Sequence, residues 1–226
     1  RVFASRARFD AESSTREFVI LTSDYGQTML GRFVATQLAI EAPGVRVRFR
    51  PLTDSVIAEA EDSLRAVDGF ILPHGFVHDL PHLDAYTDRW VILADRDNTA
   101  IGSTVRLDEL STIDWVLPFH RQGSYVPAVR QLQLLGVDLR VAVAVEGFVS
   151  LPLFIAGTQR VTMIQERLAH LIAPGDRFRI VECPFEVVPL VEALWWHPAL
   201  EHDPGHAWFR GVVERAGRAL AGHPPS

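Results

Sequence analysis

The pattern of hydrophobic positions opens with a short strand that leads directly into a helix. Residues 18–21 (FVIL) form an uninterrupted apolar run, as in a strand buried on both faces. The run ends at Thr22, Ser23 and Asp24, small polar residues that favour a helix N-terminus. Apolar residues then recur at helical spacing, at Met29, Leu30, Phe33, Val34 and Leu38. Free N–H groups at such a helix start suit a carboxylate, and open α/β sheets bind ligands at this strand end.

The alternation of strand and helix continues along the chain. Residues 45–50 alternate apolar residues with arginines, which indicates a half-buried or edge strand whose arginine face is solvated. A helix at 56–64 and a strand at 67–72 follow, and the order β-α-β-α-β predicts a parallel sheet with right-handed crossovers. Residues 79–88 are polar and predict turns. Further strands are predicted at 90–94, 115–118, 141–145, 161–164, 178–181 and 187–196, and a last helix begins at Asp203-Pro204.

These elements predict an α/β fold with two Rossmann-like lobes joined by a two-strand hinge. Residues 1–15, rich in Arg, Ser and Ala, are interpreted as a linker remnant. Lobe I comprises residues 16–90 with 195–226, and lobe II comprises residues 91–194. A ligand is expected in the cleft, where helix N-termini of both lobes converge.

Composition narrows the class of protein. The 226 residues carry a formal net charge of −6, so a DNA-binding surface within this chain is not expected, because phosphate neutralisation requires clustered basic residues. The only cysteine, Cys183, excludes an internal disulfide and fits a reducing compartment. No apolar run reaches membrane-spanning length, and the first residues lack the apolar core of a signal peptide.

No sharp catalytic or metal signature is present. The glycine-rich nucleotide-binding motifs and the G-x-S-x-G nucleophile elbow are missing. Cys183 is interpreted as a buried or edge thiol, and the pair Asp95 and Asp97 as solvated carboxylates. The sequence therefore predicts that the chain is not an enzyme and needs no cofactor.

Two groups of histidines have the spacing of metal ligands without a continuous helix to support it. His74, His78 and His82 lie four residues apart, but Gly75 and Pro81 interrupt that helix, so no metal site is predicted. Prolines also interrupt the group near the C-terminus, which is interpreted as surface and capping histidines: His197, His202 and His206.

Ligand contacts are predicted at the turns that follow strands. His74 comes just after the strand at 67–72. In the second lobe His120, Arg121 and Tyr125 offer donors at the opening of a helix, where Arg121 either binds a carboxylate bidentately or faces solvent. Phe148 follows a strand of that lobe and either contacts the ligand or packs in the lobe. The pair Trp195-Trp196 is expected mainly in hinge-strand core.

Taken in order, several segments resemble the effector-binding domain of LysR-type transcriptional regulators over about residues 16–219. They are REFVILTSDYG, APGVRVRF, VDGFILP, LGVDLRVAVAVEGF, AGTQRVTMIQERLA and WWHPALEHDPGHAWFR. The Ser/Thr-Asp-x-Gly turn and the Trp-His ending are similar to the subgroup that senses aromatic acids and plant flavonoids.

The resemblance implies a ligand-sensing domain of a bacterial, cytoplasmic DNA-binding regulator, with two lobes like those of type 2 periplasmic binding proteins. It implies homodimers, tetramers of the full protein, and promoter DNA bound through an N-terminal winged helix-turn-helix that this chain does not include. The implied effector is a small organic acid, aromatic acids included. By this resemblance its contacts come from Ser23, Asp24, Tyr25, Gly123, Ser124 and Tyr125, and the walls of the site from His74, Gly147 and Phe148. The predicted site also includes the donors His120 and Arg121 named above. The alternative is a free-standing periplasmic-type solute-binding protein, which a secretion signal in the full gene product would favour.

Overall fold

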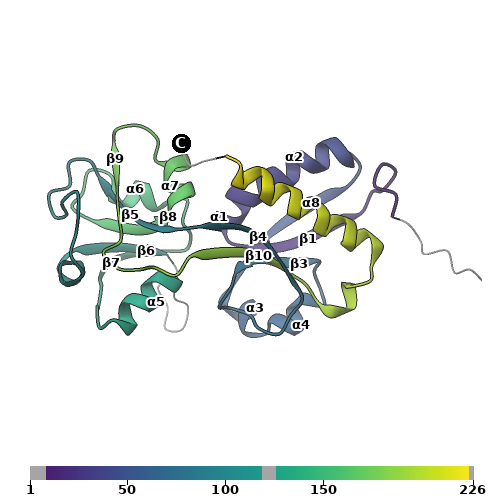
Figure 1. Cartoon of the computed structure of the whole chain (residues 1–226), viewed down its shortest axis with the longest axis horizontal. Coiled ribbons are helices and arrows are strands. Elements are labelled where there is room, and N and C mark those ends of the chain that lie inside the picture. The colour runs from purple at the N-terminus through teal and green to yellow at the C-terminus, as the bar shows by residue number, and fades with distance from the viewer. Residues whose placement is uncertain (1–8, 119–125, 224–226) are drawn as a thin grey trace, which may run out of the picture. The chain divides into compact units, whose positions relative to one another are not determined.

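The computed structural model of the chain describes residues 9–118 and 126–223 (Figure 1). The chain divides into two compact units. Unit 1 comprises Arg1–Tyr86 and Val191–Gly222, and unit 2 comprises Thr87–Leu190 and His223–Ser226. Each unit has its own five-stranded mixed sheet.

Unit 1 is built on a sheet with the strand order β2-β1-β3-β10-β4. Its strands are β1 (Glu17–Thr22), β2 (Arg46–Pro51), β3 (Gly69–Pro73), β4 (His82–Asp88) and β10 (Leu190–Trp195). Strand β1 is parallel to β2 and β3, and β10 is antiparallel to β3. The predicted β-α-β-α-β order is therefore confirmed. The helices are α1 (Asp24–Gly26), the π-helix η1 (Gln27–Gly31), α2 (Arg32–Glu41), α3 (Asp54–Ala58), α4 (Ala60–Leu64), the 3-10 helix η3 (Pro198–Leu200) and α8 (Pro204–Ala221).

Both faces of the unit 1 sheet are covered, as the apolar run of β1 predicts. On one face α2 and α8 lie side by side (Figure 1), and Phe18 of β1 stacks on Phe209 of α8 with 4.3 Å between ring centroids. Val19 and Leu21 alternate to the other face, where they pack with Leu64 of α4. Because helices cover both faces of this sheet, its polar residues gather at the ends of the strands.

Unit 2 repeats the arrangement with the strand order β7-β6-β8-β5-β9. Its strands are β5 (Trp90–Asp95), β6 (Asp114–Pro118), β7 (Arg140–Val145), β8 (Val161–Gln165) and β9 (Phe178–Val181). Strand β6 is parallel to β7 and β8, while β5 is antiparallel to β8 and β9. The helices are the 3-10 helix η2 (Leu107–Thr112), α5 (Pro127–Leu134), α6 (Leu151–Ile155) and α7 (Glu166–Ile172).

The core of unit 2 forms where the central strands meet these short helices. Trp115 of β6 is fully buried, and its indole N–H donates to the Leu110 carbonyl at 2.9 Å. Strand β7 lies at the sheet edge and is half-exposed, so its Val and Ala alternation reflects one covered face. Among the described residues, none of the helices has the length and apolarity needed to span a bilayer.

One predicted segment is wrong. Residues 79–88 were expected to form turns, but His82–Asp88 is the strand β4, which lies beside β10. Its polar residues alternate with less exposed ones along the strand, up to the buried Tyr86. The charged residues on the exposed side masked this period of two.

Candidate functional site

The turn between β1 and α1 holds the first three predicted effector residues. Ser23 is the N-cap of α1, and its hydroxyl accepts a hydrogen bond from the Gly26 N–H at 3.1 Å. The Asp24 carboxylate accepts from the Tyr25 N–H at 2.9 Å. The N–H groups of Tyr25 and Gly26 are therefore engaged within the turn. The expectation that the N–H groups here are free for an anion is wrong at these two positions, because the capping side chains bind them first.

Tyr25, the third predicted effector residue of this turn, has a buried side chain. Its side chain is 1% exposed, and its ring lies 6.3 Å from that of Tyr86, which is also buried. Gly26 follows at a point of close approach, because a Cβ atom there would overlap the Thr22 hydroxyl. The turn is thus packed tightly against the strand ends behind it.

His74 lies after β3, as predicted, but its surroundings were not foreseen. Its Nε2 lies 2.6 Å from Asp84 Oδ1, and its ring meets those of His82 and Trp195 at 4.9 and 5.0 Å. Both His82 and Asp84 belong to β4, the strand that the sequence did not predict.

In unit 2 the predicted residues fall into two groups. His120, Arg121, Gly123, Ser124 and Tyr125 lie outside the described residues. Gly147 and Phe148 follow β7; Phe148 is 6% exposed, and its ring centroid lies 6.0 Å from that of Trp90. Phe148 therefore packs against Trp90 within unit 2, and its contact with a ligand stays a prediction.

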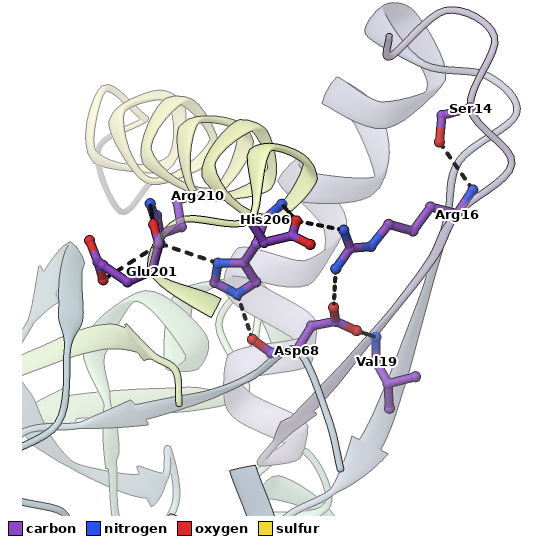
Figure 2. Close-up of polar contacts among 8 residues, drawn as sticks. Ser14, Arg16, Val19, Asp68, Glu201, His206 and Arg210 are labelled. Atoms are coloured by element: carbon purple, nitrogen blue, oxygen red, sulfur yellow. Dashed lines mark hydrogen bonds and ion pairs between the residues drawn. The ribbon is translucent and has the colours of Figure 1, made fainter. Parts of the chain in front are cut away.

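A polar network in unit 1 explains the Asp-Pro-x-His segment that carried part of the resemblance (Figure 2). Arg16, just before β1, reaches Asp68 at 2.9 Å and Asp203 at 2.7 Å. Asp203 is the N-cap of α8, as predicted, and its carboxylate accepts from the His206 N–H at 2.6 Å. The other oxygen of Asp68 accepts from the Val19 N–H at 2.8 Å. The network therefore ties the start of α8 to β1 and to the turn before β3.

His206 is at the centre of this network and is fully buried, so its interpretation as a surface or capping histidine is wrong. Its Nε2 lies 2.7 Å from the Asp68 carbonyl oxygen, so this nitrogen carries the hydrogen. Arg210 lies 3.4 Å from Nδ1 and 4.7 Å from the Trp196 ring centroid. Burial lowers the pKa of His206, and Arg210 lowers it further, against the opposing bond to Asp68. His206 is therefore a neutral, structural histidine.

The groups considered for catalysis have structural surroundings as well. Cys183 is partly buried, and burial raises its pKa to about 12, which makes it a poor nucleophile. Asp95 is buried, contrary to the expectation of a solvated pair with Asp97. It accepts N–H bonds from Gly157 at 2.5 Å and from Asp97 at 3.0 Å, and these bonds lower its pKa. Cys183 lies shortly after β9, and Asp95 is held at the end of β5 by these two backbone N–H groups.

Comparison with known proteins places this geometry in a family. The chain is 31% identical over 210 residues to nodulation protein D 2 of Rhizobium tropici, covering 91% of this chain and 65% of that protein. It is 31% identical over 223 residues to nodulation protein D 2 of Rhizobium leguminosarum bv. phaseoli, covering 96% and 69%. The chain thus spans about two thirds of the length of these relatives. No family model matches it.

Solved structures share the fold. A probable transcriptional regulator from Pseudomonas aeruginosa superposes with a TM-score of 0.80 at 24% identity, covering 92% of this chain and 69% of that one. The regulatory domain of MexT, a transcriptional activator in Pseudomonas aeruginosa, gives a TM-score of 0.71 at 20% identity, covering 90% and 98%. The predicted α/β fold with two periplasmic-binding-protein-like lobes is confirmed.

The two-sheet fold is shared with the regulatory domain of MexT. The chain belongs to the LysR family of transcriptional regulators, and it corresponds to their effector-binding domain. The relatives are regulators and not enzymes, and the regulatory domain is favoured over a free-standing solute-binding protein.

Proposed function

We propose that this domain binds a small organic acid and that binding changes how the full-length regulator acts at promoter DNA. The observation that carries the proposal is the similarity to nodulation protein D along 96% of the chain, at 31% identity. DNA would be bound by an N-terminal winged helix-turn-helix of the full protein, whose acidic effector-binding part repels phosphates. The full regulator would act in the cytoplasm, which agrees with a chain whose only cysteine is free.

The proposed contacts in unit 1 are Ser23 and Asp24, with His74 as a further wall. Asp24 carries a negative charge at the turn, so we expect the effector to present a hydroxyl or another donor there. Tyr25 would contribute indirectly, because its packing against Tyr86 would hold the turn that carries Ser23 and Asp24 in place. This refines the proposed effector to an acid that also carries a hydrogen-bond donor, with hydroxylated aromatic acids the class to try first.

The proposed contacts in unit 2 are His120, Arg121, Gly123, Ser124, Tyr125, Gly147 and Phe148. Arg121 would supply the positive charge that an organic acid requires, as a bidentate donor to its carboxylate. Phe148 would support the turn at Gly147 through its packing on Trp90. The proposal further includes homodimers of this domain and tetramers of the full protein. It includes no catalytic step, since Cys183 and Asp95 have structural surroundings.

A screen of the domain against hydroxylated aromatic acids and aliphatic acids tests the proposal. A ligand that binds only the folded state raises the melting temperature in proportion to its concentration relative to Kd. Any compound that raises it is then titrated calorimetrically into Ser23→Ala, Arg121→Ala and Ser124→Ala. Each substitution is expected to weaken binding by at least about fivefold, the loss of one hydrogen bond.

The matched control is Ser111→Ala, which removes an exposed hydroxyl bound to the Asp108 carbonyl in η2. It should leave the Kd unchanged. Because Ser23 also caps α1, its variant has a lower starting melting temperature, so the Kd and not the melting temperature decides. Binding that survives all three site substitutions refutes the proposed contacts, and a screen without any binder refutes the organic-acid class.

A further inference from the structure

Three exposed potential ligands for a transition metal lie together in unit 1: His74, His82 and Asp84. Each offers one ligand atom, and these atoms all lie within 4.8 Å of one another. The shortest separation, 2.6 Å, joins His74 Nε2 to Asp84 Oδ1, and His82 Nε2 lies 4.0 Å from the same oxygen. We propose that His74, His82 and Asp84 form a binding site for a divalent transition metal ion such as Zn²⁺.

The positions of these residues in the unit 1 sheet explain why their side chains lie close together. His82 and Asp84 are two residues apart in β4, so their side chains extend from the same face of the strand. His74 follows β3, and β10 lies between β3 and β4. The His74 N–H donates to the Val191 carbonyl in β10, and the Trp196 N–H, just after β10, donates to the Pro81 carbonyl. Both ends of the loop between β3 and β4 are therefore held in place. The three side chains therefore project from a fixed part of the sheet.

Contacts around the histidines favour ligation. The His82 Nδ1 lies 3.2 Å from the Leu80 carbonyl oxygen, so Nδ1 carries the hydrogen and Nε2 keeps its lone pair toward Asp84. A bond from the far ring nitrogen to a carbonyl is the usual support of a metal-binding histidine. The His82 ring packs on Trp195 at 4.4 Å, and the Trp195 indole is fixed by a 2.8 Å bond to the Leu72 carbonyl.

The geometry requires small side-chain movements and one proton transfer. Ligand atoms that bind Zn²⁺ tetrahedrally at about 2.1 Å lie roughly 3.4 Å from one another. Rotation of the exposed imidazoles would lengthen the distance from His74 Nε2 to Asp84 Oδ1 and shorten the distance from His82 Nε2 to the same oxygen. Since Asp84 accepts a hydrogen from His74 Nε2, ion binding requires this hydrogen to move through solvent to Nδ1, which keeps the imidazole neutral. The carboxylate and two imidazoles leave one position for water.

The ligand set selects among ions. Two imidazoles and a carboxylate suit Zn²⁺, Ni²⁺ or Cu²⁺, whereas Mg²⁺ and Ca²⁺ prefer oxygen ligands alone. The sequence predicted no metal site here because it grouped His74 with His78 on an interrupted helix. The third ligand is instead Asp84, which only the strand β4 brings into place.

Titration of the untagged, chelator-treated chain with ZnCl₂ tests the proposal, with MgCl₂ as the comparison and no effector present. We expect one Zn²⁺ per chain with a Kd on the order of micromolar, and no heat from Mg²⁺. His74→Ala and His82→Ala should each abolish measurable binding, and Asp84→Asn should weaken it. With Co²⁺ in place of Zn²⁺, the wild type should show visible absorption bands of a tetrahedral ion, and His82→Ala should not.

The matched control is His78→Ala, which removes an exposed histidine of the same loop that is not in the cluster. It should bind Zn²⁺ like the wild type. The proposal is overturned if the wild type does not bind, if the double variant of His74 and His82 still binds, or if His78→Ala loses binding equally. Melting curves without metal establish that each variant is folded; if His82→Ala is not, Asp84→Asn and His74→Ala decide the result.

Discussion

At the scale of single residues, burial distinguishes histidines that look alike in the sequence. His206 and His82 both lie in proline-interrupted groups, yet His206 is fully buried and His82 is exposed. The difference comes from the partners that the fold supplies. His206 lies between Asp68, which precedes β3, and Asp203 and Arg210, which belong to the N-cap and body of its own helix α8. Spacing along the chain contains no information about a partner as distant as Asp68, so the sequence did not predict the burial of His206.

Buried His206 makes the stability of unit 1 dependent on pH. Its pKa is lower in the folded state than the ordinary value of about 6.5. As pH falls below that value, the unfolded chain binds a proton more readily than the folded one, so the free energy of unfolding decreases until the folded pKa is reached. The contribution of His206 to the free energy of unfolding therefore has its full value above pH ~7. Urea unfolding between pH 7.5 and 5 should show a steeper loss for the wild type than for His206→Gln.

Comparing the wild type with His206→Gln between pH 7.5 and 5 distinguishes the effect of His206 from that of its neighbour Asp203. The pKa of Asp203 is also lowered: burial raises it, but the bonds from His206 N–H and Arg16 outweigh burial. A carboxylate with a lowered pKa loses its contribution only as pH falls below about 4. If His206→Gln unfolds with the same dependence on pH between 7.5 and 5 as the wild type, the assignment of that dependence to His206 is wrong.

Asp68 is expected to stabilise unit 1 more than an exposed carboxylate does. Its side chain is 15% exposed, and it binds both Arg16 and the Val19 N–H. Asp68→Ala leaves both donors without this acceptor and should cost about 2 kcal/mol of unfolding free energy. The control Glu61→Ala breaks an exposed pair with Arg65 in α4 and should cost at most about 0.5 kcal/mol. Equal losses in denaturant unfolding would contradict the proposed role of the network.

At the scale of elements, the sequence predicted those whose residues repeat a simple period. Strands β1, β5, β6 and β8 are short apolar runs, and α8 begins at Asp203-Pro204 as its capping signal predicts. Strand β4 was missed because one of its sides carries His82 and Asp84, which resemble turn residues when read singly. The missed strand then hid the cluster that His74 joins. The turn after β1 was predicted in position but not in burial, since the packing of Tyr25 on Tyr86 depends on β4.

Two glycines in α8 should respond oppositely to alanine. Gly217 is buried, and a Cβ atom there would overlap the carbonyl oxygen of Ala85 in β4. Gly217→Ala should therefore destabilise the protein by about 2–3 kcal/mol, the usual cost of overpacking. Gly211 is partly exposed, and a Cβ there meets only the end of the Arg215 side chain at 3.2 Å. Gly211→Ala should stabilise the helix by about 0.5–1 kcal/mol.

Denaturant unfolding of the two glycine variants measures both effects in one helix. Because the helix propensity of alanine is gained equally at each position, the difference between them isolates the contact with β4. A Gly217→Ala variant as stable as Gly211→Ala would mean that α8 does not approach Ala85 so closely in solution.

At the scale of the whole chain, the two units differ in how they are encoded. Nearly all of unit 2 is one continuous segment, Thr87–Leu190, and its sheet uses strands from that segment alone. Unit 1 is discontinuous, because β10 and α8 return from the far end of the sequence. Strand β10 lies between β3 and β4, and α8 contributes Phe209 to the face of β1. The first segment of unit 1 therefore lacks an interior strand and a covering helix.

This difference predicts unequal behaviour of fragments. Thr87–Leu190 alone should fold, with dispersed amide resonances and a cooperative thermal transition, because its sheet and core are complete. Residues 9–86 alone should stay unfolded or aggregate, because the gap left by β10 exposes the edges of β3 and β4. Joining residue 86 to 191 through a short Gly/Ser linker should restore a folded unit 1, since β4 and β10 are neighbours in its sheet. If residues 9–86 fold alone, or the joined chain does not fold, the division of the protein into these two units is wrong.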